Sequence, residues 1–341
     1  MEERPLISLL IPTYQEAAYV DRCLESVAGM AWPEDRLEVL VIDGGSTDGT
    51  REVIRKWEQR CSFIRMLDNP DRYVPQALNR GIRASRGEVV VFMGAHAEAP
   101  ANWLECVWED LRAHPEVTGV GGAWEIVGTS RTGKAIALAL TSRVGVGGNS
   151  YRNGKRAGYA DTIVYGAYRR ETFTRHGLLD EEMVRDQDDE LNIRLLAAGE
   201  KLWFDPRIRI KYYGRGSYAH LWQQYYQYGF WKVRLWQKVG RLGSWRQLAP
   251  MAFVGTGAAA LAALFLGGSA TLLGAGFWGL YAAVVGTGAL AAAPTHPSRW
   301  PGVAAGIVIL HGAYGLGFWE GLFRFGLLRS GARPEHTVQA R

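Results

Sequence analysis

The chain has 341 residues, of which 48% are hydrophobic and 21% charged, and its 39 Lys and Arg against 34 Asp and Glu give a net charge of +5. These averages conceal an uncharged run of 46 residues, 248–293, about twice the roughly 20 residues that cross a bilayer. Residues 1–247 carry 34 basic and 32 acidic side chains, so we expect no nucleic-acid partner. Three scattered cysteines, Cys23, Cys61 and Cys106, favour neither a disulfide framework nor a zinc knuckle and fit a reducing compartment. The charged N-terminus leads directly into a strand pattern and does not resemble a signal peptide, which predicts a cytosolic N-terminal portion.

Strand and helix patterns alternate in the first hundred residues. Short apolar runs predict strands over 6–11, 37–42, 63–67 and 88–93. Helical periodicity occupies 16–28, 50–60, 76–85 and 101–113. Such alternation is typical of a parallel sheet that is covered on both faces, an α/β fold, and ligands of these sheets bind beyond the carboxyl ends of the strands.

The middle of the chain is rich in glycine and then strongly acidic. We expect 119–166 to be irregular. The acidic residues 186–190 should open a helix that runs to about Ala198 and stops at Gly199. Acidic side chains in a first helical turn suit the helix dipole, but five polar residues in succession exceed what a cap needs.

Residues 206–247 contain nine basic residues, no acidic ones and eleven aromatics, immediately before the uncharged run. This composition predicts a helix at an anionic membrane surface, where aromatic rings settle among the headgroups and cations meet phosphate. The alternative is a basic helix that packs on the preceding domain or touches RNA.

The tail beyond this segment predicts three crossings, roughly 248–266, 270–292 and 302–323. The expected organisation is therefore an N-terminal α/β domain (1–205), an interfacial region (206–247), transmembrane helices (248–328) and a C-terminal tail (329–341). Basic residues before the first crossing place that side in the cytoplasm. Three crossings would put Arg324, Arg329 and Arg333 outside, against the same rule, so a re-entrant or interfacial segment stays open.

The residues at the predicted strand ends resemble a known family. Leu-Ile-Pro-Thr-Tyr-Gln-Glu (10–16) and Val-Ile-Asp-Gly-Gly-Ser-Thr-Asp-Gly-Thr (41–50) resemble the family-2 glycosyltransferases, which are inverting enzymes with a GT-A nucleotide-sugar fold. Gly-Ala-His-Ala-Glu (94–98), the acidic run from 186 and Gln-Tyr-Tyr-Gln-Tyr-Gly-Phe-Trp-Lys (224–232) are similar to the succinoglycan-type, lipid-linked glucosyltransferases. The resemblance covers about 6–247 and implies a Rossmann-like GT-A domain followed by a transmembrane helical region.

The resemblance implies a nucleotide pocket at the first two strand ends, formed by Pro12, Thr13, Tyr14, Glu16 and Asp43. An aromatic wall can stack on a base and a carboxylate can accept its N–H. In the alternative interpretation Pro12 only ends a strand and Asp43 belongs to a turn. Asp48 is not assigned to the pocket, because it could simply cap the helix that follows.

The resemblance also implies a divalent cation, Mn²⁺ or Mg²⁺, but the motif is altered. Gly94 stands where the family carries the leading Asp, which leaves His96 and Glu98 as candidate ligands. Mn²⁺ tolerates imidazole better than Mg²⁺ does and is slightly favoured. The alternatives are a loop histidine without metal, or a protein that has lost activity.

Asp188 matches the second acid of the family's Glu-Asp motif and is the expected general base, with Asp189 as the alternate and Gln187 at the position of the usual Glu. Gln227, Trp231 and Lys232 are the expected acceptor or membrane-interface residues. Phe230 replaces the Arg of the processive synthases' Gln-x-x-Arg-Trp motif, which argues against processive synthesis. An interfacial aromatic belt is an equal alternative for this segment.

Together these features predict an inverting glycosyltransferase of polysaccharide or glycoconjugate biosynthesis. It would move a sugar from a nucleotide diphosphate donor, a UDP-sugar by preference, to a polyprenyl-diphosphate-linked saccharide. The expected location is the inner cell membrane, with several crossings and a cytoplasmic catalytic domain. The alternatives are glycosylation of a polyprenyl monophosphate and a non-catalytic nucleotide-sugar or lipid-binding protein; a transporter is least favoured.

Overall fold

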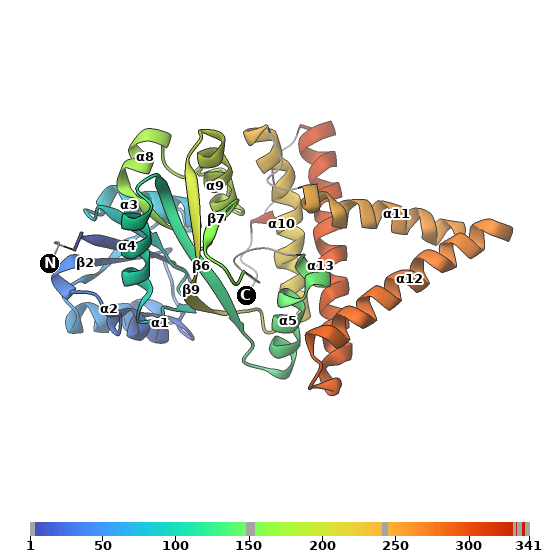
Figure 1. The fold of residues 1–341 in the computed structure, drawn as a ribbon, viewed down its shortest axis with the longest axis horizontal. Coiled ribbons are helices and arrows are strands. Elements are labelled where there is room, and N and C mark those ends of the chain that lie inside the picture. Colours follow the sequence, from blue (N-terminus) through green and yellow to red (C-terminus); the bar gives the residue numbers. More distant parts are fainter. Residues whose placement is uncertain (1–3, 148–153, 241–244, 330–331, 333–335, 338–341) are drawn as a thin grey trace. The chain divides into compact units, whose positions relative to one another are not determined.

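The structure is a computed structural model that describes residues 4–147, 154–240, 245–329, 332 and 336–337. It contains two compact units (Figure 1). The first comprises Met1–Glu125 and Ser150–Tyr212, and the second comprises Ile126–Asn149 and Tyr213–Arg341. Strand β9, Lys201–Tyr213, continues through the domain boundary expected at residue 205. Arg241 and Arg333, and most of the expected 329–341 tail, lie outside the described residues.

Four parallel strands form one half of the sheet in the first unit: β1 (Ile7–Thr13), β2 (Leu37–Asp43), β3 (Ile64–Asp68) and β4 (Val89–Phe92). They lie in the order β3-β2-β1-β4, and all residues of β1, β2 and β4 except Pro12 are buried. This parallel arrangement confirms the α/β prediction for the first hundred residues.

Helices cover both faces of this half. One core lies beneath α1 (Val20–Ala28), α2 (Thr50–Arg60) and α4 (Trp103–Ala113), and the other beneath α3 (Val74–Ala84) and α9 (Gln187–Ala197). Helix α1 begins four residues later than predicted, because the backbone N–H of Glu16 donates to the Thr50 hydroxyl and Gln15 has a φ of 55°. The loop after β1 is thus held to the start of α2.

The glycine-rich stretch is more regular than predicted. It contains most of β6 (Val117–Val127), α5 (Arg131–Thr141), α6 (Arg143–Val146) and β7 (Gly158–Ala160). Helices α5 and α6 belong to the second unit. The remaining elements of the first unit are β5 (Ala97–Glu98), β8 (Ala167–Arg169), α8 (Arg170–His176) and the short 3-10 helix η1 (Glu34–Arg36). A Cβ on Gly121 would lie 2.5 Å from that of Ile163, so this glycine permits close packing on the sheet instead of marking a loop.

The second unit is helical. Its elements after β9 are α10 (Tyr218–Val239), η2 (Trp245–Leu248), α11 (Ala249–Ala263), α12 (Gly268–Ala292), η3 (Pro297–Arg299), α13 (Trp300–Gly321) and the π-helix η4 (Leu322–Leu327). Two helical segments of the described chain, Gly268–Ala292 and Pro297–Leu327, are long and apolar enough to cross a membrane by length and composition alone. Helix α11 has 15 residues, about 22 Å, against a hydrocarbon core of about 30 Å.

Candidate functional site

The carboxyl ends of three parallel strands bring polar residues into register. Thr13 pairs with Asp43, and Asp43 pairs with Asp68 on the next strand. The Arg51 guanidinium, on the first turn of α2, donates to Asp43 at 2.7 Å and to Asp68 at 2.8 Å. This edge is where a parallel sheet binds ligands.

The side chain of Asp43 is hydrogen-bonded within its own loop. Its carboxylate accepts hydrogen bonds from the backbone N–H groups of Gly45 and Ser46, both at 3.0 Å, and from the Ser46 hydroxyl at 2.6 Å. With Arg51 as a further donor, its side chain is fully buried. The turn expected as an alternative is therefore present, and a contact from Asp43 to a base stays a prediction.

Tyr14 forms a half-buried wall beside this turn. A Cβ on Gly44 would lie 3.2 Å from the Tyr14 ring and 3.3 Å from the Cα of Arg72, so the two loops touch closely. The Arg72 guanidinium lies over the Tyr14 ring at 5.8 Å. Pro12 is half-buried, and the buried Thr13 donates its hydroxyl hydrogen to the Ile11 carbonyl at 3.1 Å.

Asp48 supports the loop, as its position suggested. Its carboxylate accepts from the backbone N–H of Ala17 at 3.0 Å and from both the backbone and the hydroxyl of Thr50. These bonds tie the loop after β1 to the first turn of α2. They account for Asp48 without a ligand.

Backbone strain gathers in the loops of the first unit. Among the described residues, four of the five non-glycine positions with positive φ belong to it: Gln15, Arg72, Tyr165 and Asp186. Such conformations cost on the order of 1–3 kcal/mol each and persist where the surrounding structure imposes them, commonly at functional sites. Gln15 and Arg72 lie in loops beside the carboxyl ends of β1 and β2, and Asp186 directly precedes α9.

The side chains of Glu16 and His96 contact each other. The His96 Nδ1 lies 2.8 Å from a carboxylate oxygen of Glu16, which is 2% exposed. The buried thiol of Cys23 donates to the carbonyl of Gly94 at 3.9 Å, and burial together with the charges of Glu16 and Glu98 raises its pKa. Glu16, expected in the nucleotide pocket, therefore contacts the expected metal ligand.

The position of the missing acid is covered by a tyrosine. An ideal Cβ on Gly94 would lie 2.7 Å from the hydroxyl oxygen of Tyr165. The Tyr165 ring packs against Trp124, which stacks on Tyr212 at 4.7 Å, and Tyr212 meets the edge of the His96 ring at 5.2 Å. Sequence reasoning did not identify these three aromatics. Trp124 and Tyr165 lie in the stretch expected to be irregular, and Tyr212 lies in β9, within the segment expected to be an interfacial helix.

The residues here can hold part of a cation's coordination shell. No group of three or more His, Cys, Asp or Glu side chains suitable for a metal ion occurs in the described part of the chain. Proteins commonly hold Mg²⁺ with one or two ligands while substrate phosphates supply others. His96 fits that pattern, because a carboxylate partner at Nδ1 orients a histidine to bind metal through Nε2. Glu98 lies 3.4 Å from Lys211.

The acidic run begins α9 as predicted and divides into different environments. Asp189 accepts a hydrogen bond from the Thr162 hydroxyl at 3.1 Å, and Glu190 pairs with Arg194 at 2.7 Å. Asp188 is half-buried and accepts the backbone N–H of Asp189 at 3.0 Å. Burial and the charges of Asp188 and Asp189 raise the pKa of Tyr168, whose hydroxyl donates to Asn192. These contacts give Asp189 and Glu190 structural partners, and the role of Asp188 as the general base stays a prediction.

Gln227, Trp231 and Lys232 lie on α10 in the second unit and are all buried, with at most 4% exposure. The indole N–H of Trp231 donates to the carbonyl of His336 at 2.9 Å, and its ring packs near Phe230 and Phe325. The aromatic stretch thus contributes to the interior of this unit. A contact of Trp231 with an acceptor sugar stays a prediction.

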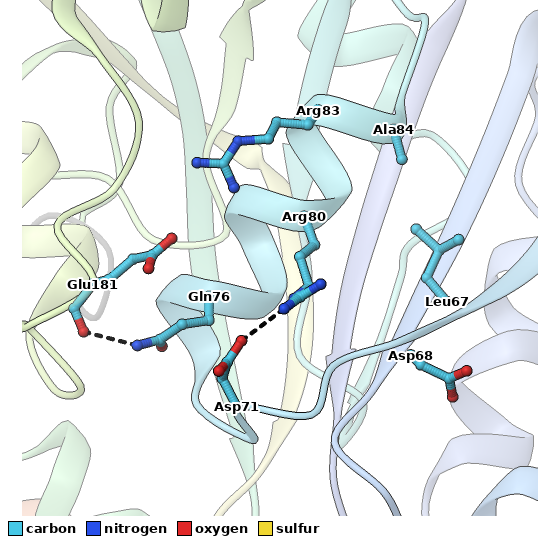
Figure 2. A pocket seen from close by; sticks show the side chains of 8 residues that line it. All are labelled: Leu67, Asp68, Asp71, Gln76, Arg80, Arg83, Ala84 and Glu181. Atoms are coloured by element: carbon cyan, nitrogen blue, oxygen red, sulfur yellow. Dashed lines mark hydrogen bonds and ion pairs between the residues drawn. The ribbon is translucent and has the colours of Figure 1, made fainter.

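A groove of about 630 Å³ lies along α3 (Figure 2). Figure 2 shows two contacts between residues that line it. Arg80 pairs with Asp71 at 2.8 Å, and the Gln76 side-chain amide donates to the carbonyl of Glu181. None of the predicted site residues lines this groove; it reaches the strand ends only at Leu67 and Asp68. We therefore place the candidate site at the strand ends, where the polar contacts converge, and not in this groove.

Known proteins are similar to this chain in sequence and in fold. The family model described as glycosyl transferase family 2 matches residues 8–173. Succinoglycan biosynthesis protein ExoA of Rhizobium meliloti (strain 1021) is 30% identical over 320 residues, which are 93% of this chain and 95% of that protein. Another relative, 31% identical over 65% of this chain and 71% of its own length, is the dolichyl N-acetyl-alpha-D-glucosaminyl phosphate 3-beta-D-2,3-diacetamido-2,3-dideoxy-beta-D-glucuronosyltransferase of Methanococcus voltae.

Among solved structures, the mannosyltransferase PcManGT from Pyrobaculum calidifontis, in complex with GDP-Man and Mn²⁺, is similar with a TM-score of 0.62. The match covers 93% of this chain and 88% of that chain at 22% identity, so it concerns the fold. It confirms the predicted GT-A type α/β domain. The Mn²⁺ in that structure supports a divalent cation as the cofactor of this fold.

Proposed function

Because this chain belongs to glycosyl transferase family 2, we propose that it is an inverting enzyme that transfers a sugar from a UDP-sugar to a lipid-linked saccharide. The observation that carries the proposal is the edge at which Thr13, Asp43 and Asp68 lie in register. Tyr14 supplies an aromatic wall beside that edge, on which a base can stack.

Asp188 acts as the general base in this proposal. The acceptor hydroxyl gives its proton to the Asp188 carboxylate while its oxygen attacks the anomeric carbon of the donor. The bond from that carbon to the diphosphate oxygen breaks on the opposite face, and the nucleoside diphosphate leaves with the bonding electrons. One carboxylate suffices, which agrees with the structural contacts of Asp189 and Glu190.

His96 would hold a divalent cation, Mn²⁺ or Mg²⁺, through Nε2 while Glu16 fixes the ring at Nδ1. When bound, the cation would neutralise charge on the diphosphate leaving group. Glu98 supplies a further carboxylate near the same loop, and Tyr165 occupies the space of the missing acid.

The acceptor is a polyprenyl-diphosphate-linked saccharide in this proposal, at the cytoplasmic face of the inner cell membrane. Two observations support a lipid-linked acceptor: the apolar C-terminal helices, and a relative whose name describes a dolichyl-phosphate-linked sugar as its substrate. That relative's acceptor carries one phosphate, which makes a lipid monophosphate acceptor the second candidate.

The function is tested with membranes that contain the protein, radiolabelled donors and extracted bacterial polyprenyl lipids. We expect transfer from a UDP-sugar to a lipid-soluble product, with GDP-mannose as the comparison donor because PcManGT was solved with it. Mass spectrometry of the product separates the two acceptors by one phosphate or two. Nucleotide binding without turnover on any donor, with Mn²⁺ supplied, would instead identify a binding protein.

A further inference from the structure

The apolar tail divides into two parts of different character within the second unit. We propose that only the α11–α12 hairpin enters the bilayer, returning to the side from which it came, while α13 lies beside α10 at the membrane surface. The inference rests on the membrane location in the proposed function, and it replaces three crossings with an even number.

Helix α13 is bound along α10 by direct backbone contact. At Gly229 of α10 a Cβ would collide with the carbonyl of Tyr314, and at Gly317 of α13 a Cβ would collide with the carbonyl of Tyr226. Near the other end, the Tyr218 hydroxyl donates to the carbonyl of Gly302 at 2.9 Å. Figure 1 shows the two helices side by side. Small residues that let two backbones touch fix the two helices at a common depth.

Helix α10 is too polar to cross a bilayer. It carries one histidine and three basic residues, His220, Lys232, Arg234 and Lys238, and it is not among the described segments apolar enough to span. An ionisable side chain at the bilayer centre is costly, whereas basic and aromatic residues suit the headgroup layer. Because α13 is held along α10, α13 is placed in the same layer.

The ionisable groups of α13 support this placement. Glu320 accepts a hydrogen bond from the Tyr226 hydroxyl of α10, pairs with Arg324 at 2.7 Å and lies 3.2 Å from His336. This polar group joins α13 to α10 and to the C-terminal segment. One face of α13 remains apolar and exposed, at Val308, Leu316 and Trp319, as a helix in the interface plane requires.

The α11–α12 hairpin has the opposite character. In α12, only 17% of the most apolar 18-residue stretch is buried in the protein. In the segment that contains α13, the corresponding share is 44%. The side chains at its tip are large, apolar and at least 74% exposed: Phe265, Leu266, Leu272 and Leu273. Figure 1 shows α11 and α12 meeting at a tip that points away from α13. No charged residue occurs in 248–293, so hydrocarbon is the environment that matches this tip.

An even number of passages also resolves a conflict of charge. With three crossings, Arg324 and Arg329 would face the outside, against the preference of basic residues for the cytoplasmic side. With a hairpin, these residues, Arg299 and the basic segment before α11 all lie on one side. The exposed basic residues on that side, such as Lys238, Arg246 and Arg329, can then meet the anionic cytoplasmic leaflet.

Cysteine accessibility tests the topology in the full-length protein. Single cysteines at Ser62, Ser298, Ala332 and Ser269, all exposed positions, are placed in a Cys61→Ser background, since Cys23 and Cys106 are buried. Inverted vesicles and intact cells are treated with a membrane-impermeant maleimide. Ser62 in the catalytic unit marks its side of the membrane. Retained UDP-sugar transfer shows that each variant is folded.

We expect cysteines at Ala332 and Ser298 to react at least tenfold more in inverted vesicles than in intact cells, as at Ser62, and the cysteine at Ser269 not to react from that side. Reaction of the Ala332 cysteine only in intact cells would show a third crossing and overturn the inference while membrane insertion stands. If instead the cysteine at Ser269 reacts in inverted vesicles as readily as the one at Ser62, and carbonate releases the protein, the membrane location itself is wrong.

Discussion

The hydroxyl oxygen of Tyr165 lies 2.7 Å from the ideal position of a Cβ on Gly94, in the space that a side chain there would need. Family resemblance places an acid at residue 94, and this chain has a tyrosine hydroxyl in its space. Tyr165 adopts a φ of 47°, which is unfavourable for a bulky residue, and its ring is held against Trp124. The glycine and the tyrosine are therefore one arrangement and should depend on each other.

A double-mutant cycle tests that dependence. We expect Gly94→Ala alone to lower UDP-sugar transfer at least tenfold, because its methyl group would press on the Tyr165 hydroxyl. In a Tyr165→Phe background the nearest ring atoms are 3.4 Å from the new Cβ, an ordinary contact, so the same substitution should cost much less. The measurement is kcat/KM for the four proteins, with thermal unfolding as the control for folding. Additive effects would mean that the two residues act separately.

Asp188 and Asp189 form a matched pair for the catalytic step. We expect Asp188→Asn to lower kcat by 10² to 10⁴, the usual worth of a general base, with donor binding unchanged. Asp189→Asn should keep most of the activity, because an amide can still accept the hydrogen bond from Thr162. Single-turnover transfer and UDP binding are measured for both. Equal losses in the two variants would remove Asp188 as the base.

The Glu16–His96 pair predicts how the cation responds to mutation. Glu16→Gln should raise the Mn²⁺ concentration for half-maximal activity about 10- to 100-fold, with most of kcat regained at saturating Mn²⁺, because the carboxylate orients the ligand. Asp48→Asn is the control, since Asp48 supports the neighbouring loop through Ala17 and Thr50. It should lower the melting temperature without moving the Mn²⁺ midpoint. An unchanged midpoint in Glu16→Gln would separate Glu16 from the metal.

Asp110 predicts a pH dependence of stability. Burial, with help from a hydrogen bond to Asp205, raises the pKa of Asp110 to about 7 in the folded protein, well above the ordinary 3.8. The folded state therefore holds a proton that the unfolded state has lost, and the free energy of unfolding falls as pH rises from about 4 to 7.

Asp110→Asn removes this charge, so we expect it to melt about 2–4 °C above the parent at pH 8 and to lose that advantage near pH 4. Thermal unfolding of the purified full-length protein at both pH values provides the measurement. Glu109→Gln, an exposed partner of the same Arg207, is the control and should bring no gain. A constant difference at both pH values would contradict the assignment.

Local patterns carried much of the fold. Helix α2 begins at Thr50 and ends at Arg60, as its periodicity predicts, and the acidic run opens α9. The polar motifs follow β1, β2 and β4 in the sequence. They lie at one edge of the sheet because the carboxyl ends of parallel strands share that edge. These features depend on hydrophobic period, turn residues and helix dipoles, which are properties of short segments.

The glycine-rich stretch shows where such reasoning ends. Gly121 suggested a loop, yet it lies in β6. A glycine is needed there because Ile163 leaves no room for a side chain. That requirement comes from a neighbour 42 positions away in the chain, and no local pattern records it.

The sequence by itself determined the α/β class, the polar residues at the carboxyl ends of the strands and the existence of an apolar tail, since each follows from the order and period of residues. Only the tertiary structure decided that Glu16 meets His96, that Tyr165 fills the space at Gly94 and that α13 is bound to α10. These contacts join residues 71 to 91 positions apart in the chain: 80 from Glu16 to His96, 71 from Gly94 to Tyr165, and 91 from Tyr226 to Gly317. Side-chain volume and hydrogen bonding across such separations exist only once the chain has folded.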